Sequence, residues 1–136
     1  MEGAMGLLAK IFGICKTDLP KDEGCWKYLN GEVKIDLKKA AELSKPGGAI
    51  RMEGKGLPER LLVVHGMDKK FYSFRNKCTH MARRLDPVSG KMTIRCCSIF
   101  SSTFDYTGRV ISGAAKKPLK TFKVKTDDNK LIIPLI

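Results

Sequence analysis

The chain has 136 residues, 43% of them hydrophobic, which predicts one globular domain with an apolar core and excludes a low-complexity chain. Twenty-six Lys and Arg against fourteen Asp and Glu give a formal net charge of +12, and a basic surface favours acidic protein partners. Nucleic acid is not an expected partner, because the chain has no nucleic-acid-binding motif and its few aromatic residues do not alternate with a basic stripe.

The first 24 residues are predicted to form an arm and linker that precede the domain. Residues 1–15 are fairly apolar, interrupted by Lys10, and residues 16–24 are polar, with Pro20 and Gly24 as breakers. The apolar stretch is too short for a transmembrane segment and lacks the layout of a secretory signal. We therefore expect a short helix that contacts a partner, a membrane surface or its own domain, followed by a single domain over residues 25–136.

The domain is predicted to be all-β with one short helix. A strand at residues 33–35 leads to a helix over residues 37–43, for which Asp36 is the expected N-cap. Further short strands are expected at residues 49–53, 61–64, 70–75, 91–97, 103–106, 109–111, 121–125 and 131–133. Many short strands separated by glycine-containing turns are typical of a β-sandwich or barrel.

The cysteines indicate a reducing compartment. Five is an odd number, and no secretory signal accompanies it. This pattern argues against a disulfide framework and favours packing, metal binding or redox chemistry in the cytoplasm.

Cys78 and His80 form the first element of a candidate metal site. In an extended segment, residues two apart point to the same side, so a thiolate and an imidazole would converge on one point. A lone Cys-x-His pair is common by chance, so its surroundings decide its meaning.

Those surroundings resemble a known family. Residues 78–90 are similar to the first ligand loop of Rieske iron–sulfur domains, which usually runs Cys-x-His-x-Gly-x-x-Leu; Ala82 takes the Gly position and Leu85 matches. Residues 97–105 keep the spacing of the second loop from its Cys to Phe104-Asp105. The resemblance covers about residues 33–136, and it implies a Rieske-type β-sandwich with a small cluster-binding subdomain, whose ligand loops lie at about residues 76–106.

The resemblance also implies a ligand set. A Rieske [2Fe–2S] cluster has one iron on two thiolates and the other on two imidazoles. Cys78, His80 and Cys97 take three of these metal-ligand positions, but Phe100 stands where the second imidazole is expected. The other histidine of the chain, His65, ends a predicted strand of the base and is not expected to bind.

Cys96 is the leading candidate for the fourth cluster ligand. Neighbours on a regular strand face opposite ways, so Cys96 would point into the base unless a bulge or the strand end re-aims it. The alternative is a small buried side chain with no cofactor role. Cys25 is a more remote candidate, which no spacing supports.

Three functions remain open at this point. The resemblance implies a one-electron carrier or redox subunit of an oxidoreductase, and the basic charge of the chain favours an acidic redox partner. The second is a clusterless binding module, like some small subunits of NADH-dependent nitrite reductase. The third is a mononuclear zinc site on Cys78, His80 and Cys97. No catalytic residue is predicted, so activity by itself is not expected.

A basic rim is predicted around the two loops. It would help to dock an acidic partner and would raise the potential of a bound cluster. Its members are Arg75, Lys77, Arg83, Arg84, Lys91 and Arg95.

Overall fold

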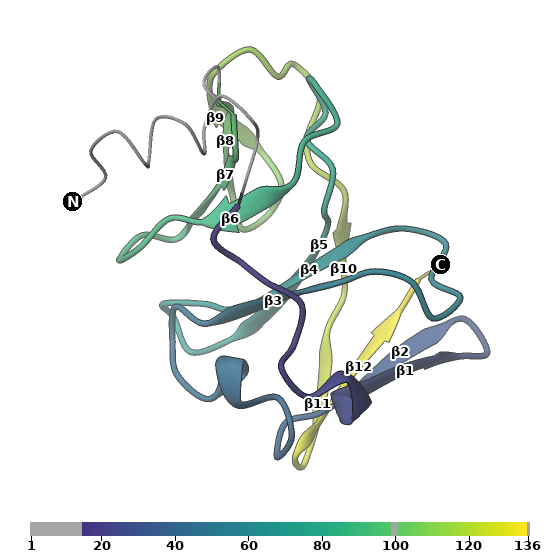
Figure 1. Ribbon diagram of the computed structural model, residues 1–136. Helices are drawn as coiled ribbons and strands as arrows, with labels where there is room; N and C mark the ends of the chain where they lie inside the picture. Colours follow the sequence, from purple (N-terminus) through teal and green to yellow (C-terminus); the bar gives the residue numbers. More distant parts are fainter. Residues whose placement is uncertain (1–14, 99–100, 136) are drawn as a thin grey trace.

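The computed structural model describes residues 15–98 and 101–135, whose strands form three four-stranded antiparallel sheets (Figure 1). The first sheet has the order β1-β2-β12-β11. Its strands are β1 (Trp26–Leu29), β2 (Glu32–Asp36), β12 (Lys130–Pro134) and β11 (Lys125–Asp127). The predicted all-β fold is confirmed.

The second sheet has the order β10-β5-β4-β3 and lies at the centre of the molecule. Its strands are β10 (Thr121–Phe122), β5 (Phe71–Arg75), β4 (Leu61–His65) and β3 (Ala49–Met52). β4 and β5 pair as an antiparallel hairpin, with Leu61 opposite Arg75 and His65 opposite Phe71.

The third sheet, β6-β7-β8-β9, forms the small subdomain that carries both predicted ligand loops. Its strands are β6 (Leu85–Pro87), β7 (Thr93–Cys96), β8 (Thr103–Asp105) and β9 (Val110–Ser112). The segment of β6 was predicted as loop, and it becomes a strand because its three residues pair with β7.

β4 explains how the three sheets hold together. Leu61, Leu62, Val63 and Val64 are all 0% exposed, so the strand is buried on both faces. Because side chains alternate along a strand, Leu61 and Val63 join the core beneath the first sheet, whereas Leu62 and Val64 join the core beneath the third. The middle sheet is therefore the common support of the base and of the small subdomain.

The predicted helix over residues 37–43 is wrong in length. It is a single 3₁₀ turn, η2 (Ala41–Leu43), preceded by a turn in which the Asp36 carboxylate accepts from the backbone N–H of Lys38 at 2.9 Å. The prediction of Asp36 as the helix N-cap is also wrong, because the N-cap of η2 is Ala40 and Asp36 caps only the preceding turn. The run is too short for an α-helix before the Pro46-Gly47-Gly48 breakers.

The described part of the arm, residues 15–24, runs from β6 past β3 to the turn η1 (Glu23–Cys25) (Figure 1). The N–H of Arg51 on β3 donates to the carbonyl of Asp18, and the N–H of Lys21 donates to the Glu42 carboxylate at 2.8 Å. The expected apolar helix of residues 1–14 lies outside the described residues, and the boundary at residue 25 stays a prediction. No helix in the described part of the chain is long and apolar enough to cross a membrane.

Candidate metal centre

Cys78 opens a tight turn after β5. Its N–H donates to the carbonyl of Arg83 at 2.7 Å, and the N–H of Ala82 donates back to the Cys78 carbonyl at 2.9 Å. This closure puts Ala82 at φ +58°, the left-handed region where the family pattern has Gly. The loop is therefore not the extended segment expected from the sequence: Cys78 is 2% exposed, whereas His80 lies on the surface.

The Cys78 sulfur is surrounded by hydrogen-bond donors. It takes a side-chain hydrogen bond from Cys96, backbone N–H bonds from His80 and Met81, and a bond from the Ser102 hydroxyl. These donors, with Cys96 first, outweigh burial and lower the pKa of Cys78 from 9.0 to about 5. These donors therefore favour the thiolate form of Cys78 despite its burial.

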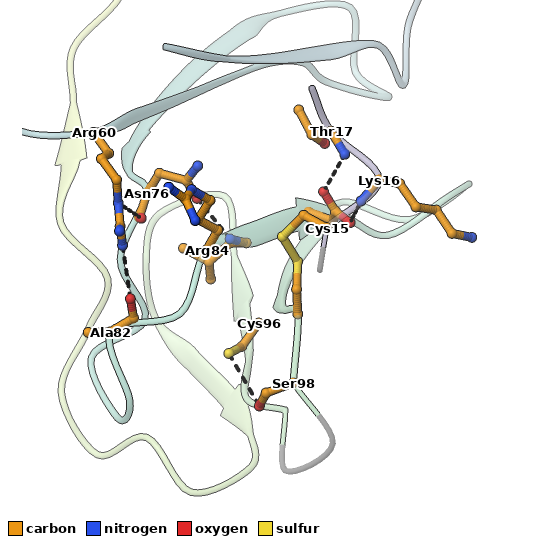
Figure 2. The surroundings of a disulfide bond; sticks show 12 residues. Cys15, Lys16, Thr17, Arg60, Asn76, Ala82, Arg84, Cys96 and Ser98 are labelled. Carbon is orange, nitrogen blue, oxygen red and sulfur yellow. Dashed lines mark hydrogen bonds between the residues drawn. A yellow bond between two sulfur atoms is a disulfide. The ribbon is translucent and has the colours of Figure 1, made fainter. Parts of the chain in front are cut away.

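Cys96 faces Cys78 from β7. Ile94 and Cys96 are the buried residues of this strand, so ordinary alternation directs Cys96 inward without a bulge. Its pKa is raised, first because its proton is held by the Cys78 sulfur and second because it is buried. Cys78 and Cys96, which we call the thiol pair, therefore influence each other's titration, and the Cys96 sulfur also lies 3.6 Å from the Ser98 hydroxyl (Figure 2).

Cys97 lies on the other side of the same backbone and is not joined to the thiol pair. Its sulfur forms a disulfide with Cys15, with Cα atoms 5.3 Å apart (Figure 2), so the sequence argument against disulfides does not hold for this pair. The Asp86 carboxylate lies within 4.8 Å of both sulfurs. In this state Cys97 has no thiolate to offer a metal.

Two other candidates lie elsewhere. His65 ends β4, where its Nδ1 is 2.9 Å from the carbonyl of Leu43 and its ring stacks on Phe71. Cys25 is 1% exposed in the core beneath the first sheet, and burial raises its pKa to about 11. Phe100, the residue in the second imidazole position, lies outside the described residues.

Sequence reasoning missed the residues that brace the first loop. Asn76 is 1% exposed, and its side-chain oxygen accepts from the N–H of Leu85 at 2.8 Å. Arg60 donates to the carbonyl of Asn76 at 3.1 Å and to that of Ala82 at 2.9 Å (Figure 2). The Arg60 contacts join the residue before β4 to the turn, about 20 residues later, so no local sequence pattern predicts them.

The second loop is held by a glycine and a serine. A Cβ on Gly113, at φ +95°, would lie 2.5 Å from the backbone of Ser101 and Ser102, so any residue larger than glycine would clash at this position. Ser102 is 0% exposed, and its hydroxyl accepts from the N–H of Ala115 at 2.9 Å while it donates to Cys78. The spacing from Cys97 to Phe104 did not single out Ser102.

An ion-pair brace joins the small subdomain to the base. Arg84 donates to both carboxylate oxygens of Glu53, at 2.7 and 2.8 Å, and Arg51 donates to one of them at 2.9 Å. The Arg84 hydrogen bonds, above all, lower the pKa of Glu53 from 4.5 to about 2. Arg84 therefore belongs to this brace, and Arg75 is likewise paired with Glu59. Lys77, Arg83, Lys91 and Arg95 of the predicted rim are exposed.

Comparison with known proteins agrees with this architecture. The sequence model of the Rieske [2Fe-2S] domain matches residues 34–123. No curated protein sequence matches the chain. Similar solved structures include the plasma membrane Rieske protein PetC3 from Synechocystis PCC 6803, at 20% identity and TM-score 0.53, over 62% of this chain and 84% of that one.

Two further structures involve carbazole 1,9a-dioxygenase. Its ferredoxin from Nocardioides aromaticivorans IC177 is 20% identical at TM-score 0.56, over 66% of this chain and 86% of its own. A complex of its reduced oxygenase and oxidised ferredoxin contains a chain 22% identical at TM-score 0.57, over 67% of this chain and 83% of that one.

The chain belongs to the Rieske [2Fe-2S] domain family. The predicted family and its class, a Rieske-type electron carrier with a [2Fe–2S] cofactor, are thereby confirmed. The site residues stay a prediction, because the match identifies the domain and not the ligands of this chain.

Proposed function

We propose that this protein is a one-electron carrier, or the redox subunit of an oxidoreductase, with a ligand set of Cys78, Cys96, His80 and Cys97. When bound, the cluster supplies reversible one-electron chemistry. The protein supplies the ligands, holds the thiolate half in a buried pocket and presents the His80 side of the loop to solvent.

The observation that carries the proposal is the thiol pair. Cys78 of the first loop and Cys96 of β7 meet in the core of the small subdomain, and three donors other than Cys96 favour the thiolate form of Cys78. A thiolate pair from two loops is what one iron of a Rieske cluster requires. The described residues thus fit the thiolate half of the group.

The other half of the site, which holds two imidazoles in the family, departs from the family pattern. His80 supplies one imidazole, and in the described residues the other histidine, His65, lies in the base. Cys97 follows Cys96 directly and is the remaining candidate donor in this loop, but its sulfur is bonded to Cys15 and faces away from the thiol pair, so it must be reduced and turn toward the pair to act as a ligand. A third thiolate in place of an imidazole adds negative charge, so we expect a potential below the usual Rieske range.

We further propose an acidic redox partner that docks on the loop surface, in the cytoplasm. The exposed basic residues Lys77, Arg83, Lys91 and Arg95 lie within or next to the two loops in the sequence, and Met81 beside His80 is 49% exposed. A positive rim around an apolar contact suits fast association with an acidic protein. The ferredoxin–oxygenase complex among the similar structures is a precedent for such docking.

The first test is anaerobic purification followed by assays of iron, acid-labile sulfide and zinc, with a visible spectrum. We expect two irons and two sulfides per chain, after reconstitution if necessary. Cys78→Ser and Cys96→Ser should each abolish binding, whereas Cys25→Ser, which removes a cysteine far from the site, should not.

The alternatives give different results. One zinc per chain without sulfide would replace the cluster by a mononuclear site. A colourless chain that binds neither metal in its reduced form would mean a clusterless binding module.

A further inference from the structure

The Cys15–Cys97 disulfide connects the N-terminal arm to the second ligand loop, 82 residues away. Cys97 is adjacent to Cys96 of the thiol pair, so the bond ends one residue from the candidate cluster site (Figure 2). This disulfide therefore links two features that the family pattern does not connect.

Asp86 positions the arm independently of the disulfide. Its carboxylate accepts from the backbone N–H of Lys16 at 2.7 Å and of Thr17 at 3.0 Å, the two residues that follow Cys15. Because these bonds do not involve sulfur, they hold Cys15 near Cys97 when the disulfide is open. A pair kept close in this way re-forms its bond readily, as a reversible redox site requires.

Exposure of the two sulfurs favours attack from one side. Cys15 is half-buried, whereas Cys97 is 9% exposed. A thiolate from solvent therefore reaches the Cys15 sulfur more readily and releases Cys97 as the leaving thiolate.

We propose that Cys15 and Cys97 form a reversible thiol–disulfide site whose reduction frees the Cys97 thiolate for the candidate cluster. The release of a usable ligand rests on the proposed function; the thiol–disulfide site itself does not. The reductant is a dithiol, either a small molecule or a dithiol protein.

The reaction balances as a two-electron exchange. One thiolate of the dithiol attacks the Cys15 sulfur, the Cys15–Cys97 bond breaks, and a mixed disulfide forms. The second thiolate of the reductant then displaces Cys15. The dithiol is oxidised to its disulfide, and its two electrons and two protons end on Cys15 and Cys97.

The test of the site uses the full chain equilibrated anaerobically in buffers of graded reduced-to-oxidised dithiothreitol, a small-molecule dithiol, with free thiols trapped by a maleimide and counted by intact mass. We expect two cysteines, mapped to Cys15 and Cys97, to change together within the range of these buffers. Asp86→Asn should open the bond at lower reductant, because it weakens the tether, and Cys25→Ser should leave the transition unchanged. A bond that stays closed in the most reducing buffer, or that never forms, overturns the proposal.

The link to the cluster is tested by reconstituting three forms with iron and sulfide: the oxidised chain, the reduced chain and Cys15→Ser. We expect the reduced chain and Cys15→Ser to take up two irons per chain and the oxidised chain to take up less than half of this. Equal loading of all three forms overturns the release of a ligand. If no form loads while the thiols still exchange, the proposed function fails and the thiol–disulfide site is upheld.

Discussion

At the scale of single residues, the thiol pair is the feature with the clearest chemistry. Burial alone raises the pKa of a thiol, as it does at Cys25. At Cys78 the opposite happens, because backbone and hydroxyl donors converge on the sulfur and Cys96 holds its proton toward it. Two cysteines of similar burial therefore have different chemistry, and the difference comes from the turn at residues 78–83.

The ultraviolet absorbance of thiolate, followed against pH in the apo protein, should show the lowered pKa of Cys78. In the reduced chain we expect one cysteine to ionise with a pKa of about 5, and Cys96→Ser to leave that titration with a changed midpoint. Ser102→Ala should raise the midpoint because it removes a donor, whereas Ser101→Ala should not. A first thiol titration near 9 in the unmodified chain would contradict the arrangement.

Ala82 offers a second test at this scale. Alanine at φ +58° is strained by about 1 kcal/mol, and glycine relieves that strain. Ala82→Gly should therefore raise the free energy of unfolding by about 0.5 kcal/mol, measured by denaturant titration.

The matched control for this change is Ala114→Gly, at an exposed position that is not among the positive-φ residues. There glycine should be neutral or destabilising, because it only adds freedom to the unfolded chain. The same sign at both positions would mean that the turn is not strained.

At the scale of elements, β3 and the first loop are joined by the brace of Glu53 with Arg84 and Arg51. The Glu53 side chain is 22% exposed, so its ion pairs are only partly screened by solvent. Together with Arg60, this brace fixes the loop against the middle sheet and thereby fixes where Cys78 meets Cys96.

The brace makes stability depend on pH. The pKa of Glu53 is lowered in the folded protein to about 2 from 4.5, so its stabilisation is complete above 4.5 and is lost as the pH falls toward 2. We expect a contribution of about 2 kcal/mol near neutral pH. Glu53→Gln should remove most of it and flatten the acid limb of a plot of unfolding free energy against pH.

Glu59→Gln is the control for this plot. Glu59 pairs with Arg75 and Lys120 at 3.0 and 3.4 Å and does not belong to the brace. An acid limb that changes equally in both variants would assign the effect to general charge and not to the brace.

At the scale of the whole molecule, the disulfide closes a loop that contains most of the domain. A cross-link across 82 residues removes entropy from the unfolded chain and typically stabilises the fold by about 2–4 kcal/mol. Reduction of the apo protein should lower the free energy of unfolding by an amount in that range. Cys15→Ser should show the same lower value with and without reductant, and an unchanged value for the reduced apo chain would contradict the cross-link.

Much of the fold follows from the sequence by itself. The short alternating segments separated by glycine turns predicted an all-β domain. They could do so because the two-residue period of a strand and the residues of a turn are both local properties of the sequence. The ligand-loop pattern from Cys78 to Leu85 and from Cys97 to Asp105 determined the family. The length of the helix after Asp36 and the formation of strand β6 were not predicted. The helix ends early because of the breakers that follow it, and β6 becomes a strand only because it pairs with β7.

Only the tertiary structure decided which cysteines meet. Cys96 and Cys97 are neighbours of identical chemistry, and their spacing in the sequence favoured Cys97 as the partner of Cys78. The pairing of β7 with β6 and β8 sets its two faces, so Cys96 points to Cys78 and Cys97 points to the arm. The contact with Cys15 spans 82 residues, and no local periodicity encodes it, because it exists only once the arm lies along β6 and Asp86 holds it there.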